Sequence, residues 1–280
     1  MSEACQWLWP ADEGALPTDD RGLAYGDGVF ETLRVTASGA VLLDAHRERL
    51  LRGCDALDIP FFREHWDDWR QRATALGLLQ ADGSDRVLKV TVTRGSGGRG
   101  YQRPSPTVPR VLTTCHGAPP LPSTAVNLQL CRQSVHVAPH RAGLKTLERL
   151  DQVMASLELR GTAFEGLMPD ASGYIAEGTR CNLIVLQGKD ELLTPPARTL
   201  AVRGTLRDWL LERSSDYGFY MREGLVSLNA IRQAQGVALI NSVFGMVTAA
   251  SLDEQRLNRS EALEELAQRV NQQLGLSRDP

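Results

Sequence analysis

Residues 141–153 read RAGLKTLERLDQV and contain Lys145, one of only three lysines in a chain of 280 residues. Leu144 and Leu147 flank this lysine, and arginines stand near it in the sequence. Burial among apolar groups and repulsion between like charges both lower the pKa of a lysine, which exposes a neutral, nucleophilic amine. Lys145 is therefore a candidate nucleophile, and an ordinary partly buried lysine is the alternative. The other two lysines, Lys89 and Lys189, fall in a strand pattern and a polar turn and suggest no such chemistry.

The composition is that of an ordinary globular protein, with 42% hydrophobic and 23% charged residues and a formal net charge of −3. Binding to a nucleic-acid backbone needs a clustered excess of positive charge, so we expect no nucleic-acid partner. The longest uncharged run, residues 235–252, is broken by glycines and polar residues, which argues against a membrane partner. Five widely spaced cysteines without a CxxC pair predict reduced thiols in a cytoplasmic protein, and we expect no metal site.

Three prolines in the stretch HGAPPLPST, residues 116–124, cannot belong to a helix or a central strand. We therefore predict an α+β domain at residues 1–115, an interdomain linker at residues 116–124 and a mixed α/β domain at residues 125–280. A chain of this length has room for two domains. Short strands with interspersed helices and no regular βαβ rhythm predict an α+β fold class rather than a doubly wound parallel sheet.

Hydrophobic periodicity gives the elements of each domain. In the first domain, alternating β-branched residues predict a hairpin that turns at residues 37–40, and Asp44 is expected to cap a helix that ends before Pro60. The remaining expected elements are a helix at 63–79, strands at 85–95, 124–132 and 180–187, and helices at 146–161, 203–218 and 260–275.

Gly95, Gly97 and Gly100 match the pattern GxGxxG directly after a predicted strand. A dinucleotide fold requires a helix to begin at this motif, but the chain continues into YQRPSPTVPR, whose prolines exclude one. The remaining interpretations are a flexible loop or a loop that binds an anionic substrate. In the second case the side chains of Arg94, Arg99 and Tyr101 are the candidate ligands.

Two further features lie downstream of Lys145. Glu177 stands just before a predicted strand, and Gly204 precedes a predicted helix whose N-terminal amides would suit a phosphate. Either feature alone is equally consistent with an ordinary loop. A reactive lysine, a carboxylate and a phosphate cradle together are the groups that a pyridoxal phosphate (PLP) site needs.

Motifs along nearly the whole chain resemble the fold type IV PLP enzymes, the family of the branched-chain and D-amino acid aminotransferases and 4-amino-4-deoxychorismate lyase. RGSGGRGY at 94–101 and GLKTLERLDQV at 143–153 resemble the lyases more than the transaminases. The other matching motifs are DRGLAYGDGVFETLRV at 20–35, HRERL at 46–50, AEGTRCNLIV at 176–185, LAVRGTLRDWLLE at 200–212 and NSVFGMV at 241–247.

The resemblance implies a role for each matching residue. Lys145 would hold PLP as a Schiff base, and Glu177 would pair with the pyridine nitrogen so that the ring accepts electrons. The phosphate would be bound by Arg49, Gly204, Thr205, Leu206 and Ser242. The substrate, with its two carboxylates, would be bound by Arg94, Arg99, Tyr101 and Tyr25.

The implied reaction is cleavage of 4-amino-4-deoxychorismate to 4-aminobenzoate and pyruvate in folate biosynthesis, with Lys145 moving the proton. Some lyases carry a threonine thought to protonate the leaving group, but here Glu31, typical of aminotransferases, stands beside Thr32. Both are catalytic candidates, although neighbours in a regular strand point to opposite faces.

The Glu31 position leaves a D-amino acid or branched-chain aminotransferase of the same fold as the alternative, but such an enzyme should lack the RGSGGRGY loop. A third interpretation is an inactive binding protein, and the joint presence of Lys145, Glu177 and Arg49 argues against it. The resemblance also implies a homodimer.

Overall fold

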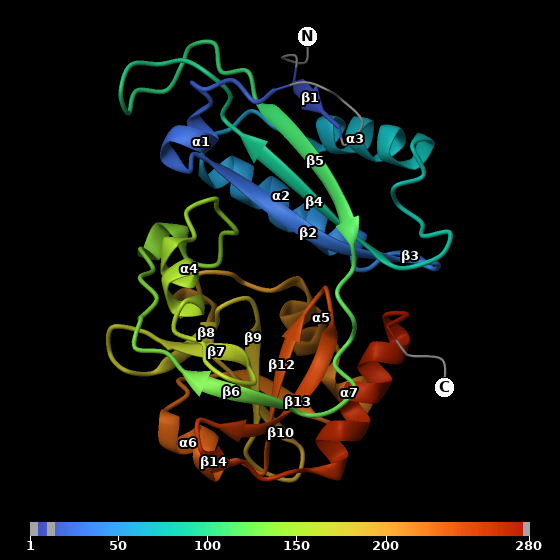
Figure 1. The fold of residues 1–280 in the computed structure, drawn as a ribbon, viewed down its shortest axis with the longest axis vertical. Coiled ribbons are helices and arrows are strands. Elements are labelled where there is room, and N and C mark those ends of the chain that lie inside the picture. The colour runs from blue at the N-terminus through green and yellow to red at the C-terminus, as the bar shows by residue number, and fades with distance from the viewer. Residues whose placement is uncertain (1–4, 10–14, 277–280) are drawn as a thin grey trace. The chain divides into compact units, whose positions relative to one another are not determined.

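The computed structural model describes residues 5–9 and 15–276, which divide into two compact units. The first unit holds the described residues up to Ala118 together with the segment Leu144–Glu148. The second holds Pro119–Gly143 and the residues from Arg149 onward. Each unit has its own sheet and its own helices (Figure 1), which confirms the predicted α+β class. Lys145 therefore belongs to the first unit, although the chain before Leu144 and after Glu148 belongs to the second.

The first unit is built on a five-stranded sheet with the order β1-β5-β4-β2-β3. β1 runs parallel to β5, and the other neighbours are antiparallel. The predicted hairpin is confirmed, with Ala37 and Ser38 joining β2 to β3. The strands are β1 Gln6–Leu8, β2 Gly28–Thr36, β3 Gly39–Ala40, β4 Arg86–Thr93 and β5 Arg110–Gly117.

Two helices pack on one face of this sheet (Figure 1) and close the core of the first unit. Leu33 of β2 and Leu88 of β4 are fully buried there with Trp66 and Trp69, whose ring centroids lie 4.5 Å apart. Trp69 Nε1 donates to the Thr113 hydroxyl at 3.0 Å, so the helix is also held by a buried hydrogen bond. The helices of this unit are α1 Arg21–Tyr25, α2 Leu43–Ala56 and α3 Arg63–Ala75.

The start of α2 differs from the sequence prediction. Leu42, with φ of 52°, precedes the helix, and no side chain caps it. Asp44 lies inside the first turn, where it accepts from Arg47 at 2.7 Å. The expectation that Asp44 caps this helix was wrong because the helix begins one residue before it; its carboxylate still favours the positive end of the helix dipole.

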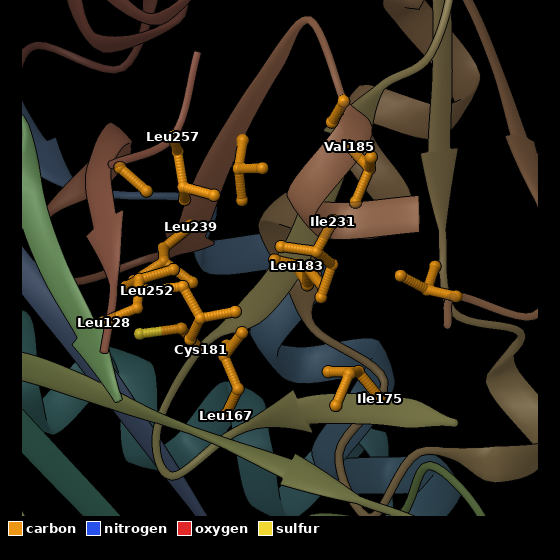
Figure 2. Close-up of a cluster of buried hydrophobic side chains, with 14 of the residues drawn as sticks. Leu128, Leu167, Ile175, Cys181, Leu183, Val185, Ile231, Leu239, Leu252 and Leu257 are labelled. Carbon is orange, nitrogen blue, oxygen red and sulfur yellow. The ribbon is translucent and has the colours of Figure 1, made fainter. Parts of the chain in front are cut away.

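The second unit contains a nine-stranded sheet whose main path is β11-β10-β9-β12-β13-β6-β7-β8, with β14 paired to β13. Apolar side chains from these strands and from α6 converge in one core (Figure 2). The strands are β6 Val126–Leu130, β7 Ala163–Pro169, β8 Ile175–Gly178, β9 Asn182–Leu186, β10 Glu191–Thr194, β11 Tyr220–Glu223, β12 Gly236–Asn241, β13 Gly245–Leu252 and β14 Gln255–Arg256. The helices are α4 Leu150–Ser156, α5 Thr205–Arg213, α6 Leu228–Gln233 and α7 Glu261–Gln273.

Several predicted boundaries shift by a few residues, among them the end of β5 and the start of α4. β5 runs through Gly117, two residues into the stretch predicted as a linker. The helix expected from Thr146 begins only at Leu150, because Thr146 forms a β-bridge with Val29 and its neighbours bond to β2. Backbone groups engaged in a bridge are not free for the helical hydrogen-bond pattern.

The cysteines and helices bear on the expectations drawn from composition. All five cysteines are free thiols. Burial raises the pKa of the Cys54 thiol, which keeps it protonated. Within residues 5–9 and 15–276 no helix combines the length and apolar character that a membrane crossing requires.

Candidate active site

The backbone of the Lys145 segment lies along the edge of β2. The Lys145 carbonyl accepts from the Phe30 N–H at 3.0 Å, and the Leu147 N–H donates to the Gly28 carbonyl at 2.9 Å. Between these two bonds, Thr146 pairs with Val29 in an antiparallel bridge. The lysine is thus fixed to a strand rather than carried on a mobile loop.

The Lys145 side chain lies over the ring of Phe30, with Nζ 4.5 Å from the ring centroid. Nζ of Lys89 lies 4.7 Å from the same centroid, so two cations share one aromatic ring. Lys89 pairs in register with Thr32, and paired residues point to the same face of a sheet. Phe30, Thr32 and both lysines therefore mark one face of β2 and β4, where a bound anion would meet positive charge.

Glu31 lies on the opposite face of β2, among the helices. Its side chain is fully buried and accepts from Arg49 Nε at 2.7 Å and Arg49 Nη2 at 2.5 Å. His46 Nδ1 lies 2.5 Å from the second Glu31 oxygen. Burial alone would raise the pKa of the Glu31 carboxyl, but the charges and hydrogen bonds of Arg49 and His46 outweigh it and hold the pKa at about 2. Glu31 is therefore an ionised anchor for Arg49, and Thr32 is the neighbour that shares a face with Lys145.

His46 completes this buried cluster as a neutral imidazole. Burial lowers its pKa, and the charges of Arg49 and Lys145 lower it further against the opposing effect of Glu31. Nδ1–H donates to Glu31, and within the described residues Nε2 has no hydrogen-bond partner. A proton on Nε2 would add a buried donor without an acceptor, so the geometry also favours the neutral form.

Glu177 lies on β8 in the second unit and is 3% exposed. One of its carboxylate oxygens accepts from Gln152 Nε2 at 3.1 Å, and the other accepts from the Val202 N–H at 3.0 Å. Both donors are neutral, so they fix the direction of the carboxylate without supplying a counter-charge.

The N-terminus of α5 has the features of an anion cradle. Gly204 precedes the helix, and no side chain caps it. The amides of Thr205, Leu206 and Arg207 have no acceptor in the described part of the chain. A Cβ at position 204 would lie 1.9 Å from Asn182 Oδ1, so any other residue would displace the Asn182 side chain, which donates to the Val202 carbonyl. Ser242, in the turn between β12 and β13, is 8% exposed.

The residues predicted to bind the substrate fall into two groups. Arg94 is buried and donates to both oxygens of Asp27 and to the carbonyls of Leu57 and Asp58, which occupies four of its five N–H groups. Arg99 and Tyr101 are exposed, and the Tyr101 ring lies 5.5 Å from the ring of Tyr25.

The predicted site residues are divided between the two units. Lys145, Glu31, Thr32, Arg49 and the loop residues belong to the first unit, whereas Glu177, Ser242 and the turn at 204–206 belong to the second. Sequence reasoning missed Arg21, Asp27, His46 and Gln152. Arg21, Asp27 and His46 stand in motifs that carry the family resemblance, which was the available signal, whereas nothing local singles out Gln152.

Residues 28–252 match the family model described as amino-transferase class IV, so the chain belongs to this family. The resemblance found in the sequence motifs is thereby confirmed. The aminodeoxychorismate lyase of Vibrio harveyi is 28% identical over 253 residues, covering 88% of this chain and 90% of that protein. The bifunctional aminodeoxychorismate lyase and D-amino acid transaminase of Mycobacterium tuberculosis is 27% identical, covering 91% and 92%. The structure of 4-amino-4-deoxychorismate lyase from Pseudomonas aeruginosa matches with a TM-score of 0.85 and 36% identity, covering 94% of this chain and 97% of that one.

Proposed function

We propose that this protein is a PLP-dependent lyase that cleaves 4-amino-4-deoxychorismate to 4-aminobenzoate and pyruvate, a step toward folate. The observation that carries the proposal is the 36% identity to the Pseudomonas aeruginosa lyase across 94% of the chain. The glycine-rich loop supports the same choice, since a transaminase is expected to lack it.

The residues present fit PLP. Lys145 would hold the cofactor covalently, Arg49 and the amides after Gly204 would bind its phosphate, and Glu177 would bind the ring nitrogen. The fit rests on α5 amides without an acceptor among the described residues and on the fixed carboxylate of Glu177. When bound, PLP withdraws electrons from the substrate carbon that carries the amine.

Lys145 Nζ takes the proton from that ring carbon as a general base. The bond between the ring and the enolpyruvyl oxygen then breaks, the ring becomes aromatic, and the released enolpyruvate takes up one proton at its methylene carbon. Atoms and electrons balance without an oxidant, because the two products together have the composition of the substrate. The hydroxyl of Thr32, on the face that holds Lys145, is the proposed donor of this proton, and it takes back a proton from the Lys145 ammonium, so that both side chains return to their starting state.

Thr32→Val keeps the shape of the side chain and removes its hydroxyl. We expect kcat for pyruvate release to fall by roughly 100-fold, the usual contribution of a positioned acid, with the PLP absorbance band unchanged. Thr32→Ser, which keeps the hydroxyl, is the matched control and should retain most of the activity. Equal kcat in all three proteins would exclude Thr32 as the proton donor.

The carboxylates of the substrate need cationic or hydrogen-bonding partners. We assign them to Arg99 and Tyr101, which are exposed, with Tyr25 beside them. Arg94 is not assigned to the substrate, because Asp27 and two backbone carbonyls occupy its guanidinium.

The experiment that tests the function supplies 4-amino-4-deoxychorismate to the holoenzyme and measures pyruvate and 4-aminobenzoate together. Both products should appear in equal amounts. A transaminase is the second candidate, favoured by Glu31 and by the bifunctional relative from Mycobacterium tuberculosis. The transaminase would be established instead if the protein exchanged amino groups between D-alanine and 2-oxoglutarate but released no pyruvate from 4-amino-4-deoxychorismate.

A homodimer is part of the proposal, and α4 supports it. Apolar side chains of α4 and of Leu157, the residue after it, recur at helical spacing, yet they are exposed: Leu150 by 68%, Val153 by 51%, Met154 by 46% and Leu157 by 63%. An apolar stripe of this kind usually marks a surface that a partner covers. We take a second copy of this chain as that partner.

Val153→Asp places a charge in the middle of this stripe and should convert the dimer to a monomer. Sedimentation equilibrium on the holoenzyme would show the mass halved. Leu76→Asp, at an exposed leucine after α3, is the control and should leave the mass unchanged. A wild-type protein that sediments as a fully active monomer would contradict the homodimer.

A further inference from the structure

Arg21 occupies the base of the glycine-rich loop. It is the first residue of α1 and only 4% exposed. Its Nη1 donates to the carbonyls of Gly100 and Gln102 at 3.1 Å and of Gly97 at 3.4 Å, and its Nη2 donates to the Tyr101 carbonyl at 3.4 Å. One guanidinium therefore gathers four carbonyls of a single loop, a pattern for which its planar fork of donors is suited.

The base beneath Arg21 is itself fixed. Asp27 accepts from Arg21 Nε at 2.9 Å and from Arg94 Nε at 2.7 Å with the same oxygen. Burial alone would raise the pKa of Asp27, but the hydrogen bonds of Arg94 and Arg21 outweigh it and lower the pKa, so the carboxylate stays ionised. Arg94 also donates to carbonyls at the end of α2. The loop is thus tied through Arg21 and Asp27 to the packed helices.

The loop backbone has one defined shape. Gly95, Gly97, Gly98 and Gly100 all have positive φ, between 59° and 104°. A Cβ on Gly98 would lie 2.2 Å from the Gln102 carbonyl oxygen, so the two sides of the loop are in backbone contact. The interpretation as a flexible loop does not fit these contacts.

We propose that Arg21 is a positioning residue for substrate recognition. It does not touch the substrate, because it is buried and its guanidinium is occupied by the loop and Asp27. By holding the carbonyls on both sides of Arg99, it keeps Arg99 and Tyr101 in the arrangement that receives an anionic substrate, without an ordering cost at each binding event. The part of this inference that concerns substrate rests on the proposed lyase function.

Limited digestion with trypsin tests the loop directly, because trypsin cleaves after arginine and Arg99 is exposed in the loop. In Arg21→Lys one ammonium replaces the fork and cannot serve four carbonyls, so the loop should open more often and be cleaved at Arg99–Gly100 roughly tenfold faster than in wild type. Arg21→Ala should act in the same direction. Gly98→Ala, which disturbs the loop but leaves Arg21 and Asp27 in place, should also be cleaved faster. Faster cleavage therefore does not require a folding defect around Arg21.

Kinetics of the same variants test the role in recognition. KM for 4-amino-4-deoxychorismate should rise roughly tenfold, the cost of ordering one or two side chains, while kcat and the PLP absorbance band change little. Arg86→Lys is the matched control, since Arg86 also donates to two loop carbonyls, those of Gly77 and Gln80, elsewhere in the same unit. It should leave both measurements at their wild-type values.

The outcomes separate the two proposals. Unchanged cleavage and unchanged KM in both Arg21 variants would overturn the role of Arg21. Faster cleavage with unchanged KM would restrict Arg21 to loop structure and overturn its part in recognition. If wild type releases no pyruvate from the substrate but the variants are cleaved faster, the lyase function fails while the loop contact stands.

Discussion

Lys145→Ala should lose the visible absorbance band that the wild-type protein develops with PLP. Its release of pyruvate should fall by at least about 1000-fold, because one residue supplies both the covalent hold on the cofactor and the base that moves the proton. The position of Lys145 supports this size of effect. Its backbone is bonded to β2 on both sides of the bridge at Thr146, and its amine lies over Phe30, so the sheet holds the proposed base in a fixed place.

The scarcity of lysine makes this prediction easy to map. Reduction of the holoenzyme with borohydride should attach PLP to one tryptic peptide, and the chain offers only Lys89, Lys145 and Lys189 as side-chain acceptors. Lys189→Ala, at an exposed turn, is the matched control and should keep the band and the activity. Attachment at Lys89 or Lys189, or a band that survives in Lys145→Ala, would refute the assignment.

The role proposed for Lys145 could be derived from the sequence because it rests on local features: a rare residue type, apolar neighbours and a family motif. The arrangement around it was not. The segment Leu144–Glu148 leaves the second unit to pair with a strand more than 100 residues earlier, and no local periodicity records such a pairing. For the same reason, the helix predicted from Thr146 loses its first turn to β2.

Glu31 shows a signal in the sequence that could have been used. Val29, Glu31, Leu33 and Val35 alternate on one face of β2, so a carboxylate stands in an apolar register. A charge in that position needs a buried partner, and Arg49 and His46 lie on the helix that follows. The family resemblance assigned Arg49 to the cofactor phosphate. The contact of Arg49 with Glu31 required the structure, because it joins residues 18 positions apart.

For the glycine-rich loop, residues 94–101, the backbone shape was predictable from the sequence, but the contacts that hold it were not. The glycines of RGSGGRGY indicate positive φ and close backbone contact, so the shape of the loop was accessible from sequence. The fourfold contact of Arg21 was not, because backbone carbonyls have no residue identity and leave no pattern to read. Interactions between a side chain and a distant backbone are thus the part of this site that sequence reasoning misses.

Glu31→Gln should destabilise the protein by about 3–5 kcal/mol, because it leaves the buried Arg49 guanidinium without its counter-charge. Gln keeps the shape of Glu but has one neutral oxygen acceptor where Glu has two charged oxygens. Its amide N–H groups would face the N–H donors of Arg49 or His46. The midpoint of thermal unfolding of the apoprotein should fall by roughly 10 °C. Glu48→Gln, on the helix that carries Arg49 but half-exposed beside Arg47, is the control and should change stability by less than about 1 kcal/mol.

The pH dependence of the free energy of unfolding tests the same contact of Glu31. A carboxyl whose pKa is lowered on folding, here from 4.5 to about 2, contributes its full stabilisation above pH 4.5 and loses it as the pH falls toward 2. The difference in stability between wild type and Glu31→Gln should therefore be constant from pH 7 to about 5 and shrink below 4.5. His46, whose pKa is also lowered, mainly by burial, makes wild type and variant alike lose stability as the pH falls below 6.5, so it does not alter their difference between pH 7 and about 5. A difference that stays constant down to pH 2 would mean that folding does not lower the pKa of Glu31, so that Arg49 and His46 do not stabilise its charged form as the contacts indicate.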